Sequence, residues 1–181
     1  MFIDKLIDDI IVREGGYVDH PDDRGGPTCW GITQAVARDH GFNGPMRQLP
    51  KDVARKIYRD RYYVKPGFNR VSAHSLRVAE EMTDTGVNMG TRRSAQFLQA
   101  ALNALNRGGS DYPDLTVDGD IGPATLSALQ KYMMVRDGKG GEMVLLKALN
   151  CLQGAKYLEI AERDHRQESF VYGWLAHRVV L

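Results

Sequence analysis

Residues 13–33 read REGGYVDHPDDRGGPTCWGIT, and this stretch separates one amphipathic segment from a long remainder of helical pattern. It combines a glutamate and several aspartates with five glycines and two prolines, a composition typical of turns and loops. Within it, residues 17–18 and 29–32 predict two short strands of a small hairpin. The stretch therefore predicts a helix that ends, a hairpin, and then a mainly helical chain.

The segment before this stretch predicts an amphipathic helix. Its apolar side chains recur every three or four residues and form one wide stripe: Phe2, Ile3, Leu6, Ile7, Ile10 and Ile11. Gly15 and Gly16 are a strong signal for the end of the helix. Glu14 continues the line of Leu6 and Ile10, so we expect it on the apolar face of the last turn.

The remainder of the chain predicts helices. Periodicity, capping residues and breaks place them at 33–39, 50–63, 75–89, 92–107, 123–136, 142–165 and 169–178. The break at 107–120 is interleaved with hydrophobic residues, which favours a long loop inside one body over a flexible linker. The predicted fold class is mainly α, with a small β-hairpin near the N-terminus.

Length and composition are those of an ordinary globular protein. The chain has 181 residues, 43% hydrophobic and 26% charged, which suits one domain or one domain with a small subdomain. The formal net charge is +1, so no global field favours nucleic acid as a partner. Residues 51–65 carry six basic and two acidic side chains, which fits either a solvated helix face or a docking surface for an anionic polymer.

The sequence also bears on location. No stretch approaches the ~20 apolar residues that a membrane span needs, so membrane insertion is not expected. The N-terminus has three acidic residues among its first nine and no small-residue cleavage site, unlike a secretory signal. We therefore expect synthesis in the host cytoplasm, without a signal peptide.

Cofactor and metal chemistry find no support in the sequence. The five histidines are scattered, and Cys29 and Cys151 are too few for a disulfide framework or a metal motif, so we expect free and mostly buried thiols. Residues 114–125 resemble a calcium loop only superficially, because Thr125 stands where the bidentate glutamate belongs. No nucleotide or serine-hydrolase motif is present. We expect neither a metal nor a cofactor.

Glu14 is the strongest candidate for a catalytic residue. Partial burial on the apolar face and the negative end of the helix dipole both favour the protonated carboxyl, which is the form that a general acid needs. The alternative is a terminal glutamate that bends into solvent. Asp19, Asp22 and Asp23 follow on the loop, and one of them can supply the second carboxylate of a glycosidase. Equally, aspartates beside proline and glycine can simply form turns.

Residues 14–33 resemble the signature of the glycoside hydrolase family 108 muramidases, which runs E-G-G-Y, a turn, and then G-G-x-T-x-x-G-I-T. The resemblance continues in DTGVNMGTRRSAQFLQAALN, residues 84–103, and in LTVDGDIGPATLSAL, residues 115–129, which is similar to peptidoglycan-binding modules. FVYGWLAHRV, residues 170–179, is similar to the family's closing segment. The resemblance therefore covers nearly the whole chain.

The resemblance implies a lysozyme-like, two-lobed helical fold. It implies a catalytic region over residues 1–90 and a helical peptidoglycan-binding-like region over residues 91–181, both packed into one globular body. The implied reaction is hydrolysis of the β-1,4 bond between N-acetylmuramic acid and N-acetylglucosamine, without a cofactor. Residues 115–129 could bind glycan or belong to the core, and their apolar content favours the core.

The resemblance also implies roles for individual residues. Glu14 is the implied general acid. Asp23 is the first choice for the partner of Glu14, because of its spacing from that residue. Asp22, however, fits the spacing to Thr28 better. Thr28 is implied to help orient a water. The implied substrate-binding residues are Tyr17, Gly26, Trp30 and Asn88. Tyr17 and Trp30 could stack on sugars or merely pack.

Two other functions remain open at this point. A lytic transglycosylase also uses one glutamate on a lysozyme-like fold, and a non-catalytic module would bind peptidoglycan without turnover. The expected partner is peptidoglycan, and the expected state is a monomer. A chain without a signal peptide favours a phage endolysin that reaches the wall in the periplasm through a holin, although a role in toxin release fits the same chemistry.

Overall fold

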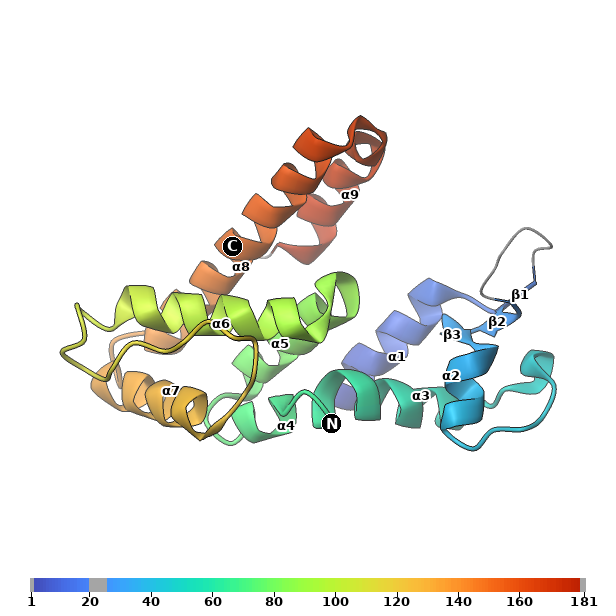
Figure 1. Ribbon diagram of the computed structural model, residues 1–181, viewed down its shortest axis with the longest axis horizontal. Coiled ribbons are helices and arrows are strands. Elements are labelled where there is room, and N and C mark those ends of the chain that lie inside the picture. The colour runs from blue at the N-terminus through green and yellow to red at the C-terminus, as the bar shows by residue number, and fades with distance from the viewer. Residues whose placement is uncertain (1, 20–25, 180–181) are drawn as a thin grey trace. The chain divides into compact units, whose positions relative to one another are not determined.

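The computed structural model describes residues 2–19 and 26–179 (Figure 1). The chain divides into two compact units, Met1–Lys65 and Pro66–Leu181. The first contains a small sheet among helices, and the second contains helices alone in its described part. The predicted mainly α fold, with two lobes and a small β-structure near the N-terminus, is confirmed.

The first unit is built around α1 and a three-stranded antiparallel sheet. Its elements are α1 (Phe2–Glu14), β1 (Tyr17–Val18), β2 (Thr28–Cys29), β3 (Ile32–Thr33), α2 (Gln34–Asp39), a 3₁₀ turn (Met46–Gln48), α3 (Lys51–Arg59) and a π-helical turn (Asp60–Val64). The strand order is β1-β2-β3, with Tyr17 opposite Cys29 and Cys29 opposite Ile32. The sequence predicted one hairpin, whereas residues 29–32 form two strands because a tight turn at 30–31 separates them.

The apolar stripe of α1 packs against α3. Ile3, Ile7, Ile10 and Ile11 are buried, as predicted from their spacing. On the neighbouring polar faces, Arg59 binds Asp4 at 2.6 Å, and Arg55 binds both carboxylate oxygens of Asp8. Because these pairs are exposed to solvent and screened by it, they fix the register of α1 on α3 more than they stabilise it. Arg55 and Arg59 of the basic stretch are thus engaged within the unit.

The second unit is helical, and the helices predicted from 75 onward are confirmed with small shifts at their ends. Its elements are α4 (Phe68–Val71), α5 (Leu76–Met89), α6 (Thr91–Leu105), α7 (Pro123–Val135), α8 (Gly141–Arg163), a 3₁₀ turn (His165–Gln167) and α9 (Glu168–Arg178). Gly90, at φ +90°, forms the corner between α5 and α6. The sequence analysis missed α4, which is one short turn.

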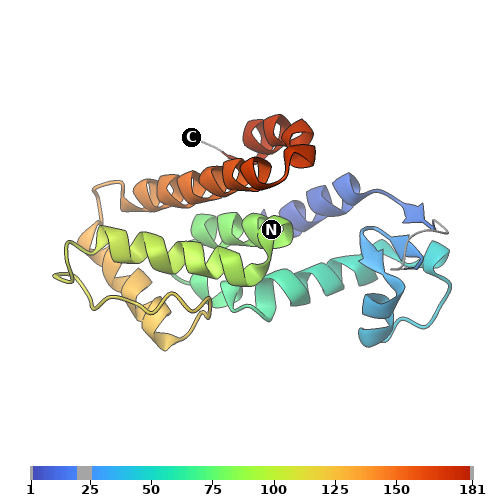
Figure 2. The ribbon, with the colours of Figure 1, turned by 45° about the horizontal axis from the view of Figure 1, so that its top comes forward.

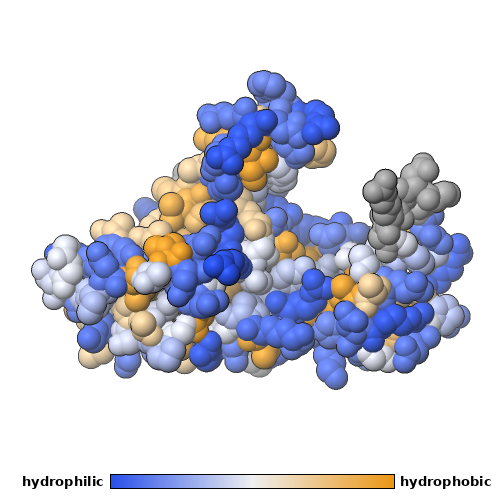
Figure 3. Space-filling view, in the orientation of Figure 1, coloured by the Kyte–Doolittle hydropathy of each residue, from blue (hydrophilic) through white to orange (hydrophobic). Residues whose placement is uncertain are grey.

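Helices α8 and α9 lie side by side as a hairpin (Figure 2). Leu175 and Val179 each lie 3.7 Å from the point where a Cβ on Gly154 would stand, so Gly154 faces this part of the chain at an ordinary van der Waals distance. On the outer surface of this hairpin, hydrophobic residues lie among hydrophilic ones (Figure 3). Phe170 is 55% exposed and Tyr172 is 84% exposed.

The loop at 106–122 is held to α6 by side-chain amides. Gln99 donates to Asp118 at 2.7 Å and accepts from the Gly119 amide at 2.8 Å. Asn103 bonds to both backbone groups of Leu115, at 2.7 and 2.8 Å. Asp118 and Gly119 of the module-like motif are therefore used in building the loop, and Thr125 behind them is buried.

Glu81 of α5 should make stability depend on pH. Burial, and then the charge of Asp84, raise the pKa of Glu81 to about 7 from an ordinary value of 4.5. Between these two values the folded chain binds more protons than the unfolded chain, so stability should fall as the pH rises from 4.5 to 7 and then level off.

The variant Glu81→Gln should remove this slope. At pH 8 its free energy of unfolding should exceed that of the parent by on the order of 2 kcal/mol. Urea unfolding at several pH values between 5 and 8 measures both effects. Glu162→Gln, which alters an exposed glutamate of α8, is the matched control and should keep the slope. A Glu81→Gln profile parallel to that of the parent would show that this carboxyl is not the group responsible.

Candidate active site

Glu14 is the last residue of α1, and its side chain is exposed. The prediction of a partly buried glutamate is therefore wrong for this structure. Gly15 follows at φ +78° and turns the chain away, so the end of the helix remains open to solvent. The stem of the side chain is held: Cβ and Cγ of Glu14 both lie 3.0 Å from the point where a Cβ on Gly31 would stand.

The turn between β2 and β3 is the surface against which Glu14 packs. Trp30 and Gly31 have φ values of +55° and +71°, as a two-residue type I′ hairpin turn requires. Tryptophan is uncommon in this conformation, and two hydrogen bonds hold it there. Its indole Nε1 donates to the Leu49 carbonyl at 3.0 Å, and its own carbonyl accepts from the Tyr58 hydroxyl at 3.1 Å.

Tyr58 of α3 brings a buried hydroxyl to the same point. The oxygen lies 2.6 Å from the position that a Cβ on Gly31 would occupy, so only a glycine lets Tyr58 and Glu14 converge there. Burial raises the pKa of Tyr58, and the negative charge of Glu14 raises it further. The hydroxyl therefore remains protonated and can donate a hydrogen bond at any physiological pH.

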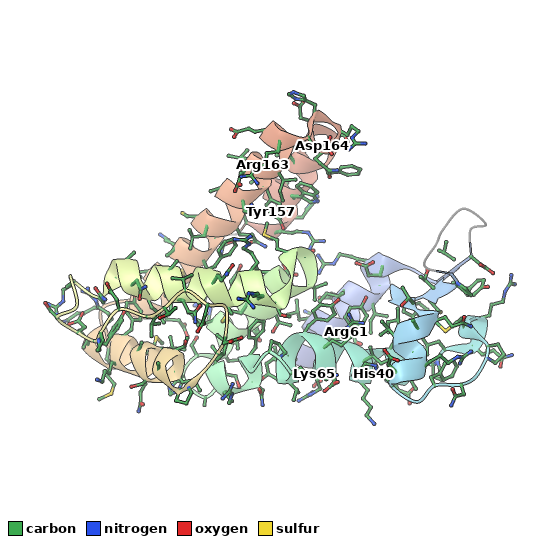
Figure 4. The ribbon with its side chains drawn as sticks, in the orientation of Figure 1. His40, Arg61, Lys65, Tyr157, Arg163 and Asp164 are labelled. Carbon is green, nitrogen blue, oxygen red and sulfur yellow. The ribbon has the colours of Figure 1, made fainter. Side chains whose placement is uncertain are left out.

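A pocket of about 160 Å³ opens beside this turn. Gly31 and Thr33 line one side, and Tyr58, Arg61 and Tyr62 line the other. The rings of Tyr58 and Tyr62 stack with centroids 5.6 Å apart, and the Arg61 guanidinium lies 5.8 Å from the Tyr62 ring centroid. Figure 4 labels Arg61 on the segment that follows α3. Because Gly31 both lines the pocket and contacts Glu14, this glutamate stands at the edge of the pocket.

The sequence analysis did not identify Tyr58, Arg61 or Tyr62. The available signal was helical spacing within the basic stretch: Tyr58 and Tyr62 are four residues apart, and Arg61 lies between them. That spacing puts 58 and 62 on one face of a helix, which the π-helical turn at Asp60–Val64 continues. The prediction for this stretch rested on its charge and did not include its aromatic face.

The other predicted catalytic residues have different outcomes. Thr28 lies on β2, is half-buried, and donates from Oγ1 to the Val18 carbonyl at 3.4 Å, a contact that joins two strands. Asp22 and Asp23 lie outside the described residues, and their roles remain predictions. Asp19 is exposed and accepts a hydrogen bond from Tyr17 at 2.8 Å.

The predicted sugar-binding residues divide between the two units. Tyr17 and Trp30 each have a cation over the ring: Arg47 lies 4.6 Å from the first centroid and Lys51 lies 4.8 Å from the second. These contacts support a packing role for both rings. Gly26 has φ +69°, and no atom of the residues that the structure describes lies within 4 Å of where a Cβ would be.

Asn88 belongs to the second unit. Its Nδ2 donates to the Asp84 carbonyl oxygen at 2.8 Å and to the Asp84 carboxylate at 3.2 Å, both on its own helix. It lines a second pocket, which lies entirely within residues 66–181.

Metal binding, membrane insertion and thiol chemistry can also be judged over the described ranges. No group of three histidine, cysteine, aspartate or glutamate side chains there could hold a metal ion. Nor does any helix in those ranges have the length and apolar character to cross a membrane. Both cysteines are free: Cys29 is buried, as expected, whereas Cys151 on α8 is exposed, contrary to expectation.

Comparison with known proteins finds a matching family for each of two stretches of the chain. Residues 7–90 match the family described as glycosyl hydrolase 108, and residues 93–179 match the one described as predicted peptidoglycan domain. A solved structure of Brucella abortus SagA is similar over 99% of this chain and 98% of that chain, with a TM-score of 0.53 and 24% identity, which shows a shared fold. No curated protein matches significantly.

The two matches are consecutive and together account for nearly the whole chain. A glycosyl hydrolase region followed by a peptidoglycan domain means that the chain is a glycoside hydrolase acting on peptidoglycan. The chain therefore combines a glycosyl hydrolase 108 region at residues 7–90 with a predicted peptidoglycan domain at residues 93–179.

Proposed function

We propose that the chain is an N-acetylmuramidase that hydrolyses the β-1,4 bond between N-acetylmuramic acid and N-acetylglucosamine, with Glu14 as the general acid. One observation carries the proposal. The exposed Glu14 carboxyl is held by its stem against Gly31, at the edge of a pocket lined by Tyr58, Arg61 and Tyr62. An acid that reaches solvent beside an aromatic pocket can approach a glycosidic oxygen of a bound sugar.

In the proposed reaction, Glu14 transfers its proton to the oxygen of the leaving sugar while the glycosidic C–O bond breaks. A water adds its hydroxyl to the anomeric carbon and releases a proton to a base. Asp23, or Asp22, is the proposed partner that either positions this water or stabilises the positive charge that develops on the sugar. Thr28 is proposed to assist in orienting the water.

The pocket supplies plausible contacts for the sugar. Tyr62 offers an aromatic ring on which a pyranose can pack, and Arg61 offers hydrogen-bond donors for hydroxyl or acetamido oxygens. A sugar seated there would also cover Glu14. Removal of water from a carboxyl by a bound substrate favours its protonated form.

Several finer predictions remain as the sequence suggested them. The division into a catalytic region at 1–90 and a binding region at 91–181 differs from the division into compact units at Lys65 and Pro66. The monomeric state also remains a prediction. We further propose action on the wall in the periplasm, as an endolysin whose access depends on a holin if a phage encodes it.

Product analysis tests the reaction type. Purified sacculi are digested with the full chain, the products are reduced with borohydride, and the masses are determined. Hydrolysis should give muropeptides with reducing N-acetylmuramic acid ends, which borohydride converts to the alcohol. Products that end in anhydro-muramic acid and resist reduction would instead establish a lytic transglycosylase, and intact sacculi with bound protein would establish a binding module.

A further inference from the structure

The second unit contains a pocket of about 340 Å³ where the corner between α5 and α6 meets the α8–α9 hairpin. Arg93 and Lys156 line it with basic side chains, and Asn88 and Gln167 line it with amides. The indole of Trp174 lines it as well. Ligand sites in proteins commonly enclose roughly 300–1,000 Å³ and combine an apolar wall with a few polar groups, so this pocket has the size and the character of a small binding site.

The aromatic wall of this pocket is preorganised. Trp174 of α9 stacks on the buried Tyr157 of α8, with ring centroids 5.0 Å apart, and Phe170 also stacks on Trp174, with centroids 6.0 Å apart. Figure 4 labels Tyr157 on α8. At the other end of α9, Arg178 lies 3.9 Å from the Asp84 carboxylate of α5. Because these contacts fix α9 in place, a ligand would meet a wall that is already formed.

The charge around the pocket favours an anion. Lys156 pairs with Glu159 at 2.9 Å, and Arg163 binds the same carboxylate at 2.5 Å. Arg93 also acts on Glu159 through its charge. Three basic side chains thus share one acidic partner. Lys156 can turn to a ligand carboxylate while Arg163 still neutralises Glu159.

We propose that this pocket binds the acidic stem peptide of peptidoglycan, with Arg93 and Lys156 holding its carboxylates and Trp174 contacting its aliphatic part. The proposal rests on peptidoglycan being the substrate. In peptidoglycan the free carboxylates belong to the stem peptides, because the sugars are N-acetylated and the lactyl carboxyl is consumed in the bond to the peptide. A neutral glycan offers these two cations only uncharged acceptors, whereas a stem peptide offers the complementary charge.

Isothermal titration calorimetry on the full chain tests this assignment. The probes are a synthetic stem tripeptide, L-Ala-γ-D-Glu-diaminopimelate, and a neutral N-acetylglucosamine oligosaccharide. The tripeptide should bind, and Arg93→Gln and Lys156→Gln should each weaken its binding about tenfold, the loss of one charge-assisted contact. Added salt should weaken binding further because the groups are partly exposed.

Matched controls lie on the same helices. Arg92→Gln on α6 and Lys147→Gln on α8 each remove an exposed positive charge outside the pocket, and they should leave the affinity unchanged. Equal weakening by all four variants would mean general attraction and would overturn the proposal. Binding of the neutral oligosaccharide that is lost in Arg93→Gln and Lys156→Gln would also overturn it, in favour of a glycan site.

Failure here is distinguishable from failure of the proposed catalytic function. If sacculi are hydrolysed but the tripeptide does not bind, only the stem-peptide site is wrong. If the tripeptide binds as expected but sacculi remain intact, only the muramidase proposal is wrong. Melting temperatures of all four variants close to that of the parent would show that lost affinity is not lost folding.

Discussion

Replacing Glu14 by glutamine is expected to lower the rate of peptidoglycan cleavage by about 10²–10⁴-fold, the usual contribution of a general acid. The amide keeps the size of the side chain and its packing against Gly31, but it has no acidic proton to give to the leaving oxygen. The rate is followed as the loss of turbidity of purified sacculi, with the released reducing ends counted in parallel. Circular dichroism should be unchanged, because the altered group is exposed.

The Glu14→Gln variant should be more stable than the parent, although it is less active. A negative charge at the C-terminal end of a helix is unfavourable, so its removal should stabilise the fold by roughly 0.3–1 kcal/mol. Asp9→Asn on the same helix, also exposed, is the matched control and should retain full activity. Near-normal cleavage by Glu14→Gln would exclude Glu14 as the acid, whatever its stability.

The fold was predictable where one periodic pattern dominated. The stripe of α1 and the helices α5 to α8 follow from helical spacing, because each buries one apolar face in its own unit. The third strand, β3, could not be predicted from a periodic pattern. It depends on Trp30 accepting a positive φ, which a local propensity disfavours and which the contacts with Leu49 and Tyr58 stabilise from elsewhere in the chain.

The site was predictable only in part, for a related reason. Helix phase correctly put Glu14 on the last turn of α1, but phase alone cannot tell whether neighbouring elements cover that turn, and the glutamate is exposed. Tyr58 lies 44 positions further along the sequence, and only folding brings its hydroxyl to Gly31. A motif thus pointed to the proposed acid, whereas the residues that surround it could be found only from the folded structure.

Replacing Gly31 by alanine is expected to lower activity by about 100-fold, the cost that a displacement of about 1 Å can have in an active site. The new methyl group would stand 2.6 Å from the Tyr58 hydroxyl and 3.0 Å from Cβ and Cγ of Glu14. Tyr58 cannot yield easily, because it is buried, stacked on Tyr62 and bonded to the Trp30 carbonyl. The strain should therefore displace Glu14 from the edge of the pocket. Cleavage of sacculi and urea unfolding measure the two consequences.

Gly41→Ala separates this contact from backbone strain. Gly41 has φ +84°, similar to the +71° of Gly31, but no atom lies within 4 Å of its would-be Cβ. Both variants should lose about 1–2 kcal/mol from the left-handed conformation, and only Gly31→Ala should lose activity. In the double variant Gly31→Ala/Tyr58→Phe the hydroxyl that clashes is gone, so activity should recover toward that of Tyr58→Phe alone. If the double variant is no more active than Gly31→Ala, the Tyr58 hydroxyl is not what forces Glu14 away from the pocket.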